Sequence, residues 1–104
     1  MSLKEIQTQV DAWAQQFKVP YFQPLEIMVR LTEETGELAR EINHCFGPKK
    51  KKSSEEVREI GDELGDIIFT VVVMANKLNI DLDDIFSRVM DKCYGRDNNR
   101  YEKK

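Results

Sequence analysis

The sequence has few cysteines and no long apolar segment. Cys45 and Cys93 are its only two cysteines in 104 residues, and the opening stretch Met1–Glu5 carries no apolar signal segment. We therefore expect free thiols rather than disulfides, in a protein of the reducing cytoplasm. The longest apolar run, Ile67–Ala75, is far shorter than the roughly 20 residues that span a bilayer, which argues against a membrane role.

The chain also lacks an excess of positive charge and has a single histidine. A net charge of −3 argues against a general nucleic-acid binder, because such proteins usually present a dominant basic face. His44 follows Glu41 in a Glu-x-x-His pattern, which is half of a di-iron carboxylate site. That chemistry usually needs two such motifs, so one histidine argues against it.

The composition that is present fits a soluble, helix-rich protein. Charged residues make up 34% of the chain and apolar residues 40%. A length of 104 residues suffices for one modest core, so we expect residues 1–104 to form one domain. There is no strand-like alternation and no internal repeat. The expected fold is all-α, a four-helix bundle.

Apolar residues recur at helical spacing in four segments, each with a recognisable start. Ser2 with Glu5 predicts a capping box, and Pro24 is well placed as a first helical residue. The expected helices run from the Ser2 cap to about Phe17, from Pro24 to near Phe46, from the Ser53 cap to about Leu78, and from the Asp81 cap to Gly95. The lysine run Lys49–Lys52 between the second and third helices is expected to be a solvated loop.

Beyond Asp66 the third helix is apolar on nearly every side. Phe69, Val72 and Val73 add to the stripe that a single core would require. A four-helix monomer cannot easily cover so much apolar surface. We therefore expect a homo-oligomer, either a homodimer or a homotetramer, that associates through apolar helix faces.

Acidic residues gather on one side of two separate helices. At about 100° per residue, Glu33, Glu34 and Glu37 share an arc of about 100° on the second helix. Glu63 and Asp66 are paired in the same way on the third helix. Each acidic arc borders an apolar arc, so packing of the apolar arcs would bring the carboxylates together.

Converging carboxylates repel one another, and they are costly beside an apolar seam unless a cation neutralises them. Oxygen-only ligands suit Mg²⁺ or Mn²⁺. A single pair of such acids on a helix is usually a solvated face. That interpretation predicts interleaved lysine or arginine, yet none lies between Glu33 and Glu37 or between Asp62 and Asp66.

The EExxE pattern at Glu33–Glu37, followed by ExxD at Glu63–Asp66, resembles the MazG-like family of all-α nucleoside-triphosphate pyrophosphohydrolases. The resemblance covers roughly Leu25 to Tyr101. It implies a Mg²⁺-dependent hydrolase that cleaves a ribo- or deoxyribonucleoside triphosphate between its α- and β-phosphates. The products would be a nucleoside monophosphate and pyrophosphate, in keeping with house-cleaning of the nucleotide pool.

The resemblance also implies roles for individual residues. Glu34, Glu37, Glu63 and Asp66 would be metal ligands. Glu33 would be either a further ligand or the residue that orients and deprotonates the attacking water.

Two basic residues and several aromatic ones complete the expected site. The resemblance implies that Lys92 and Arg96 contact phosphates, although Gly95 could end the helix before Arg96. Without the resemblance, these cations would be a solvated helix end favoured by the helix dipole. A nucleobase could stack on Trp13, or on its neighbours Tyr21 and Phe22, unless Trp13 is simply a core residue.

Two alternatives remain at this stage. The related phosphoribosyl-ATP pyrophosphohydrolases share the acidic helices and also release pyrophosphate. A non-catalytic helical module that binds a nucleotide or another protein through its apolar helix is the alternative from a different class.

Overall fold

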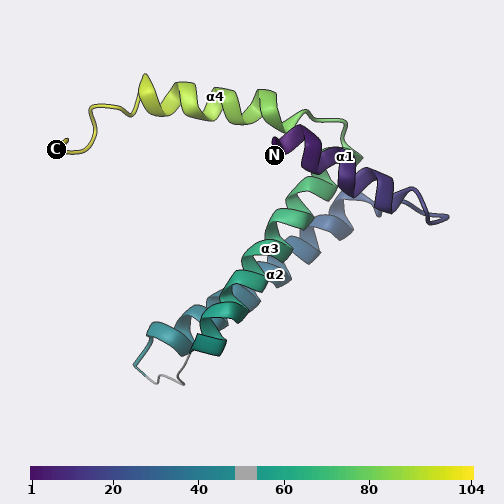
Figure 1. The fold of residues 1–104 in the computed structure, drawn as a ribbon, viewed down its shortest axis with the longest axis horizontal. Coiled ribbons are helices and arrows are strands. Elements are labelled where there is room, and N and C mark those ends of the chain that lie inside the picture. The colour runs from purple at the N-terminus through teal and green to yellow at the C-terminus, as the bar shows by residue number, and fades with distance from the viewer. Residues whose placement is uncertain (49–53) are drawn as a thin grey trace.

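The computed structural model describes residues 1–48 and 54–104, and in these residues it contains four α-helices and no strand (Figure 1). The helices are α1 (Leu3–Ala14), α2 (Pro24–Phe46), α3 (Ser54–Lys77) and α4 (Leu82–Tyr94). The prediction of an all-α fold with four helices is confirmed. The expected Ser53 cap and the Lys49–Lys52 loop lie outside the described residues.

Helix α1 begins at the predicted capping box but ends earlier than expected. The Glu5 backbone N–H donates to Ser2 Oγ at 3.0 Å, and the Ser2 backbone N–H donates to Glu5 Oε1 at 2.8 Å. The helix ends at Ala14, so the predicted end at Phe17 is wrong. The last residues tighten into i→i−3 bonds, with Phe17 N donating to the Ala14 carbonyl at 3.1 Å, and this tightening ends the α-helix.

The other described boundaries follow the local signals closely. Pro24 opens α2 as its first residue, where its missing N–H costs nothing. Asp81 caps α4 by accepting from the Asp83 N–H at 3.0 Å, and Gly95 follows its last residue. Helix α3 ends at Lys77, one residue before the expected Leu78.

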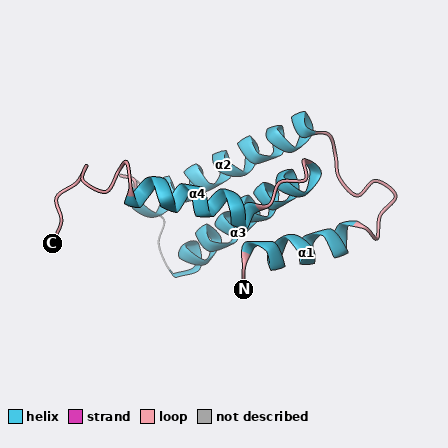
Figure 2. Cartoon of the chain, turned by 90° about the horizontal axis from the view of Figure 1, so that it is seen from above, coloured by secondary structure: helices cyan, strands magenta, loops and turns pink. Residues whose placement is uncertain are grey.

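Helices α2 and α3 lie side by side as a long antiparallel hairpin, and α1 packs across one end of it (Figures 1 and 2). The buried apolar residues in the part of the chain whose burial is described are few: Ala14, Ile27, Val72 and Ala75. They come from α1, α2 and α3, so the core sits where these three helices meet. Most of the hairpin lies beyond this core.

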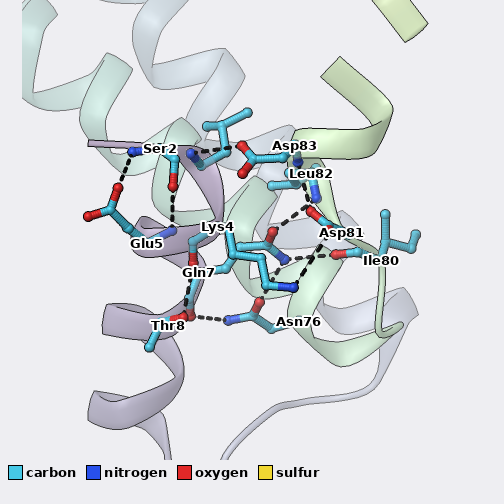
Figure 3. Close-up of polar contacts among 11 residues, drawn as sticks. Ser2, Lys4, Glu5, Gln7, Thr8, Asn76, Ile80, Asp81, Leu82 and Asp83 are labelled. Carbon is cyan, nitrogen blue, oxygen red and sulfur yellow. Dashed lines mark hydrogen bonds and ion pairs between the residues drawn. The ribbon is translucent and has the colours of Figure 1, made fainter. Parts of the chain in front are cut away.

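A polar junction ties α1 to the turn between α3 and α4 (Figure 3). The Gln7 side-chain amide donates to Asn76 Oδ1 at 3.0 Å and to the Ile80 carbonyl at 2.8 Å. Its oxygen accepts from the Leu82 N–H at 2.9 Å. Asn79 adopts a left-handed conformation with φ 57°, which asparagine tolerates better than most residues. These contacts set the direction in which α4 leaves.

Helix α4 projects away from the α2–α3 hairpin and makes its main contacts with α1 (Figure 1). None of its residues is buried, and its apolar stripe is exposed to solvent: Ile85, Phe86, Val89 and Met90. Among the described residues, no helix is both long and apolar enough to cross a membrane.

The chain exposes far more surface than a compact protein of its size. Its accessible area is 8301 Å², against about 6,100 Å² expected for a folded monomer of this mass. Its radius of gyration is 17.0 Å, against about 13 Å for a compact domain of this length. A large apolar area is therefore uncovered in the single chain.

Candidate active site

Three predicted metal ligands from two helices come together in the hairpin. Glu34 and Glu37 from α2 and Glu63 from α3 each offer one carboxylate oxygen, and these oxygens lie within 4.8 Å of one another. The i,i+3 spacing of Glu34 and Glu37 places them on one side of α2. The antiparallel pairing of α2 with α3 then brings Glu63 opposite them.

The cluster is partly withdrawn from water. The Glu34 side chain is 12% exposed, and one oxygen each of Glu34 and Glu63 is buried with no hydrogen-bond partner in the described part of the chain. Partial burial raises the pKa of Glu63 to about 7, and the neighbouring carboxylates of Glu37 and then Glu34 add to the effect. A buried anion without a partner is costly, so this donor set fits a hard divalent cation.

Asp66 and Glu33 lie beside this cluster rather than inside it. Both line an adjoining cavity of about 470 Å³, which Glu34 also borders. Asp66 is nearly one helical turn beyond Glu63 on α3, and its carboxylate is not among those that lie within 4.8 Å of one another. Of the four predicted ligands, the single chain therefore brings three within one ion's reach and places the fourth on the neighbouring wall.

Aromatic side chains also line this cavity. Trp13 lines it together with Tyr21, Phe22 and Phe69. Trp13 meets Phe69 edge to face, with ring centroids 5.9 Å apart, and remains 54% exposed. It is therefore a partly exposed residue of the cavity wall rather than a core residue.

Phe69 and Arg30 also line the cavity, and the sequence motifs assigned neither of them to the site. Phe69 was assigned only to the apolar surface of α3, although it follows Asp66 by nearly one helical turn. Arg30 precedes Glu34 by about one turn of α2, and its Nε lies 3.3 Å from Glu34 Oε1. Helical spacing from the acidic motif could have identified both.

The two basic residues predicted to contact phosphate do not reach this cavity within the chain. Lys92 lies in the last turn of α4, and Arg96 follows the end of that helix. The Arg96 guanidinium instead pairs with Asp97, with Nε 2.9 Å from Oδ1. Neither residue is among those that line the cavity.

Comparison with known proteins decides the family. Residues 22–101 match the family model of the MazG nucleotide pyrophosphohydrolase domain. The chain belongs to the MazG family. The MazG match spans both acidic motifs, the Phe22 and Phe69 walls of the cavity, and α4.

Individual MazG-like relatives agree with this assignment. The chain is 48% identical to YpjD of Bacillus subtilis (strain 168) over 103 residues, covering 99% of this chain and 93% of YpjD. The YpjD crystal structure superposes with a TM-score of 0.81, covering 88% of this chain and 94% of that one at 49% identity. The Bacillus-conserved MazG protein, a nucleotide pyrophosphohydrolase, gives a TM-score of 0.77 at 50% identity, with 88% of each chain covered.

Proposed function

We propose that this protein is a divalent-metal-dependent hydrolase that cleaves nucleoside triphosphates between the α- and β-phosphates, releasing a nucleoside monophosphate and pyrophosphate. The observation that carries the proposal is the position of the carboxylate cluster Glu34–Glu37–Glu63 directly beside an aromatic-walled cavity. One end suits a metal-bound polyphosphate, and the other suits a nucleobase. The similarity to a nucleotide pyrophosphohydrolase supports the same reaction class.

Glu34, Glu37 and Glu63 would hold Mg²⁺ or Mn²⁺, with Asp66 binding a further ion or its waters on the cavity side. A bound ion would neutralise the phosphate charge and lower the pKa of a coordinated water. Glu33 is exposed and lines the cavity, so it would either orient the attacking water and accept its proton or serve as a further metal ligand. More than one ion would be needed to offset the negative charge of both the acids and the triphosphate. Several carboxylates are therefore needed, because one pair would not hold two or more ions.

The nucleoside would occupy the cavity between the acids and the aromatic wall. Trp13 would stack on the base, since a ring that is 54% exposed can accept a second ring on its face. A volume of about 470 Å³ lies within the usual range for a small-molecule site.

We further propose that the active form is a homodimer or homotetramer. The area of 8301 Å² leaves an excess of about 2,200 Å² over a compact monomer, which is the scale of a stable homo-oligomeric interface. Gly61 and Gly65 on α3 have no described side chain or neighbouring helix within 4 Å of an added Cβ, and Ile68 beside them is 55% exposed. A partner helix could approach α3 closely there.

Association would also complete the site. Helix α4 projects away from the chain's own hairpin, with Lys92 in its last turn and Arg96 just beyond its end, so these residues would contact phosphates in the cavity of a partner copy. Each site would then combine acids from one chain with cations from another.

A substrate panel tests the proposal. The protein is incubated with ribo-, deoxyribo- and modified nucleoside triphosphates and with phosphoribosyl-ATP at fixed Mg²⁺, and pyrophosphate and orthophosphate are measured separately. We expect pyrophosphate with nucleoside triphosphates. Turnover of phosphoribosyl-ATP alone would assign the other pyrophosphohydrolase activity, and orthophosphate alone or no turnover would contradict the proposal.

A further inference from the structure

One cation lies at the border between the carboxylate cluster and the cavity. Arg30 lines the cavity, and of the described residues that do so it is the one with a basic side chain. Its Nε donates to Glu34 Oε1 at 3.3 Å, while Glu34 also belongs to the three-carboxylate cluster. Arg30 therefore contacts a member of the carboxylate cluster and also borders the cavity that the aromatic side chains line.

The contact between Arg30 and Glu34 is weakly held. It is an i,i+4 pair on α2, and the Arg30 side chain is 67% exposed. Glu34 itself is only 12% exposed, but water reaches the guanidinium, so Arg30 can turn toward another anion without leaving its own charge buried. A guanidinium carries five N–H donors, and only one of them is used in this contact.

We propose that Arg30 contacts the α-phosphate of the bound nucleotide. This inference rests on the proposed function and adds a substrate-binding residue to it. With the base against Trp13 and the polyphosphate at Glu34–Glu37–Glu63, the α-phosphate falls where these two parts of the site meet, which is where Arg30 lies. The planar guanidinium matches two phosphate oxygens at once.

The contact suits the reaction that the site would carry out. The water oxygen forms a bond to the α-phosphorus, and the bond from that phosphorus to the bridging oxygen breaks. Pyrophosphate leaves with the electron pair, and the water's proton goes to the base. Arg30 neither gives nor takes a proton; it balances negative charge on the non-bridging α-phosphate oxygens, as arginines do in other phosphoryl transfers.

A purely structural role for Arg30 predicts a different response to substitution. If Arg30 only positioned Glu34 for the metal, its removal would weaken metal binding, and activity would fall by the same factor. If it contacts phosphate, its removal deletes a positive charge beside three carboxylates, so metal affinity should stay equal or rise. A fall in metal affinity would therefore indicate the structural role, whereas equal or higher affinity would indicate phosphate contact.

The test uses the full chain with Arg30→Ala and Arg30→Lys. Arg40→Ala is the matched control, because Arg40 is on the same helix, is 69% exposed, lies 4.0 Å from Glu41, and does not line the cavity. Calorimetry measures Mn²⁺ binding alone, and then binding of a non-hydrolysable α,β-imido nucleoside triphosphate at saturating Mn²⁺. Steady-state kinetics then separate kcat from KM.

For Arg30→Ala we expect unchanged or tighter Mn²⁺ binding, analogue binding weakened about 10- to 100-fold, and a fall in kcat as well as in kcat/KM. Arg30→Lys should recover part of the lost analogue affinity, because lysine restores the positive charge but not the planar pair of N–H donors. Arg40→Ala should match the wild type. Analogue affinity unchanged by Arg30→Ala, or Mn²⁺ affinity reduced in step with activity, would overturn the inference.

The binding measurements also separate this inference from the proposed function. A wild-type protein that turned over no nucleoside triphosphate would contradict the function, whatever the variants did. The analogue-binding comparison would still decide whether Arg30 contacts the nucleotide's phosphates.

Discussion

At the scale of single residues, the carboxylate cluster concentrates negative charge in a small volume. One oxygen each of Glu34 and Glu63 is buried without a hydrogen-bond partner in the described chain, and Glu37 lies beside them. Such an arrangement is stable only if a proton or a cation offsets the repulsion. The choice between proton and cation gives the site a measurable pH dependence.

The metal-free protein should lose stability as pH rises. The pKa of Glu63 in the folded protein is raised to about 7 from 4.5, so the folded state binds more protons than the unfolded state between these values. This contribution is fully present below pH 4.5 and is lost as pH rises through about 7. We expect the Tm measured in a chelator to fall as the pH is raised from about 5, near the lower of these two pKa values, to about 8, above the higher one.

The same charge should make added Mg²⁺ more stabilising at the higher pH, because metal ligands must be deprotonated. Glu63→Gln is the control, since it cannot titrate and should flatten both trends. If the Tm measured in a chelator rose with pH in the wild type and did not rise in Glu63→Gln, this account would be contradicted.

Glu37→Gln should abolish catalysis without unfolding the chain. The substitution keeps the shape of an exposed side chain but removes one of three clustered charges. We expect kcat/KM to fall about 100-fold or more, and Mg²⁺ no longer to raise the Tm as it does in the wild type. Circular dichroism should remain helical.

Glu41→Gln provides the comparison for Glu37→Gln, because Glu41 is one turn further along α2, outside the cluster, and pairs with Arg40. Asp66→Asn should also remove activity if Asp66 binds metal from the neighbouring wall. Activity that survives both Glu37→Gln and Asp66→Asn would exclude the proposed site.

At the scale of helices, α1 contacts both α3 and the start of α4 and fixes their relative positions. Its Gln7 side chain bonds to Asn76 at the end of α3 and to the backbone of Ile80 and Leu82 (Figure 3). Its Trp13 stands at the wall of the cavity. The same short helix therefore positions both the direction of α4 and the aromatic side of the site.

Gln7→Ala should destabilise the protein by about 1–3 kcal/mol, because it leaves partly buried polar groups on α3 and the following turn without partners. Urea unfolding followed by circular dichroism measures the change. Gln15→Ala is the control: Gln15 is exposed and bonds only locally to Asp11, so we expect little effect. Equal losses for the two variants would show that the junction has no special importance.

At the scale of the whole molecule, the single chain is extended rather than compact. Its area of 8301 Å² and radius of gyration of 17.0 Å both exceed the values for a compact monomer. In the described part of the chain, the apolar stripe on α4 and many apolar residues of the hairpin are exposed. The large area and the large radius of gyration follow from the position of α4, which contacts α1 and projects away from the α2–α3 hairpin.

A complementation experiment should show that one site draws on two chains. Glu37→Gln removes an acid from the cluster, and Lys92→Ala removes a cation from α4, so each variant alone should be inactive. Mixed, unfolded and refolded together, they should regain about a quarter of wild-type activity, because half of randomly paired dimers contain one intact site out of two.

Sedimentation should show the same dimer or larger assembly for both variants and for the mixture. Activity of the mixture that equals the average of the two parents would contradict a shared site. A monomeric wild type would contradict both the oligomer and the role of Lys92 in a partner's cavity.

Local chemistry along the chain determined the helices and the residue types of the site. Capping at Ser2 and Asp81, the first-position proline at Pro24, and the spacing of the acids all act over three or four residues, so they can be read without a fold. The early end of α1 is the exception, because a tightened turn after Ala14 depends on where the connector must go.

Only the tertiary structure decided how the site is divided. The register of α2 against α3 brings Glu63 to Glu34 and Glu37 and leaves Asp66 on the cavity wall. The packing of α1 across the hairpin forms a cavity that is lined by Trp13 of α1 and Arg30 of α2. The turn after α3 directs α4, and with it Lys92, away from this cavity. Such contacts join residues far apart in sequence, and their geometry depends on packing between helices rather than on the pattern within any one of them.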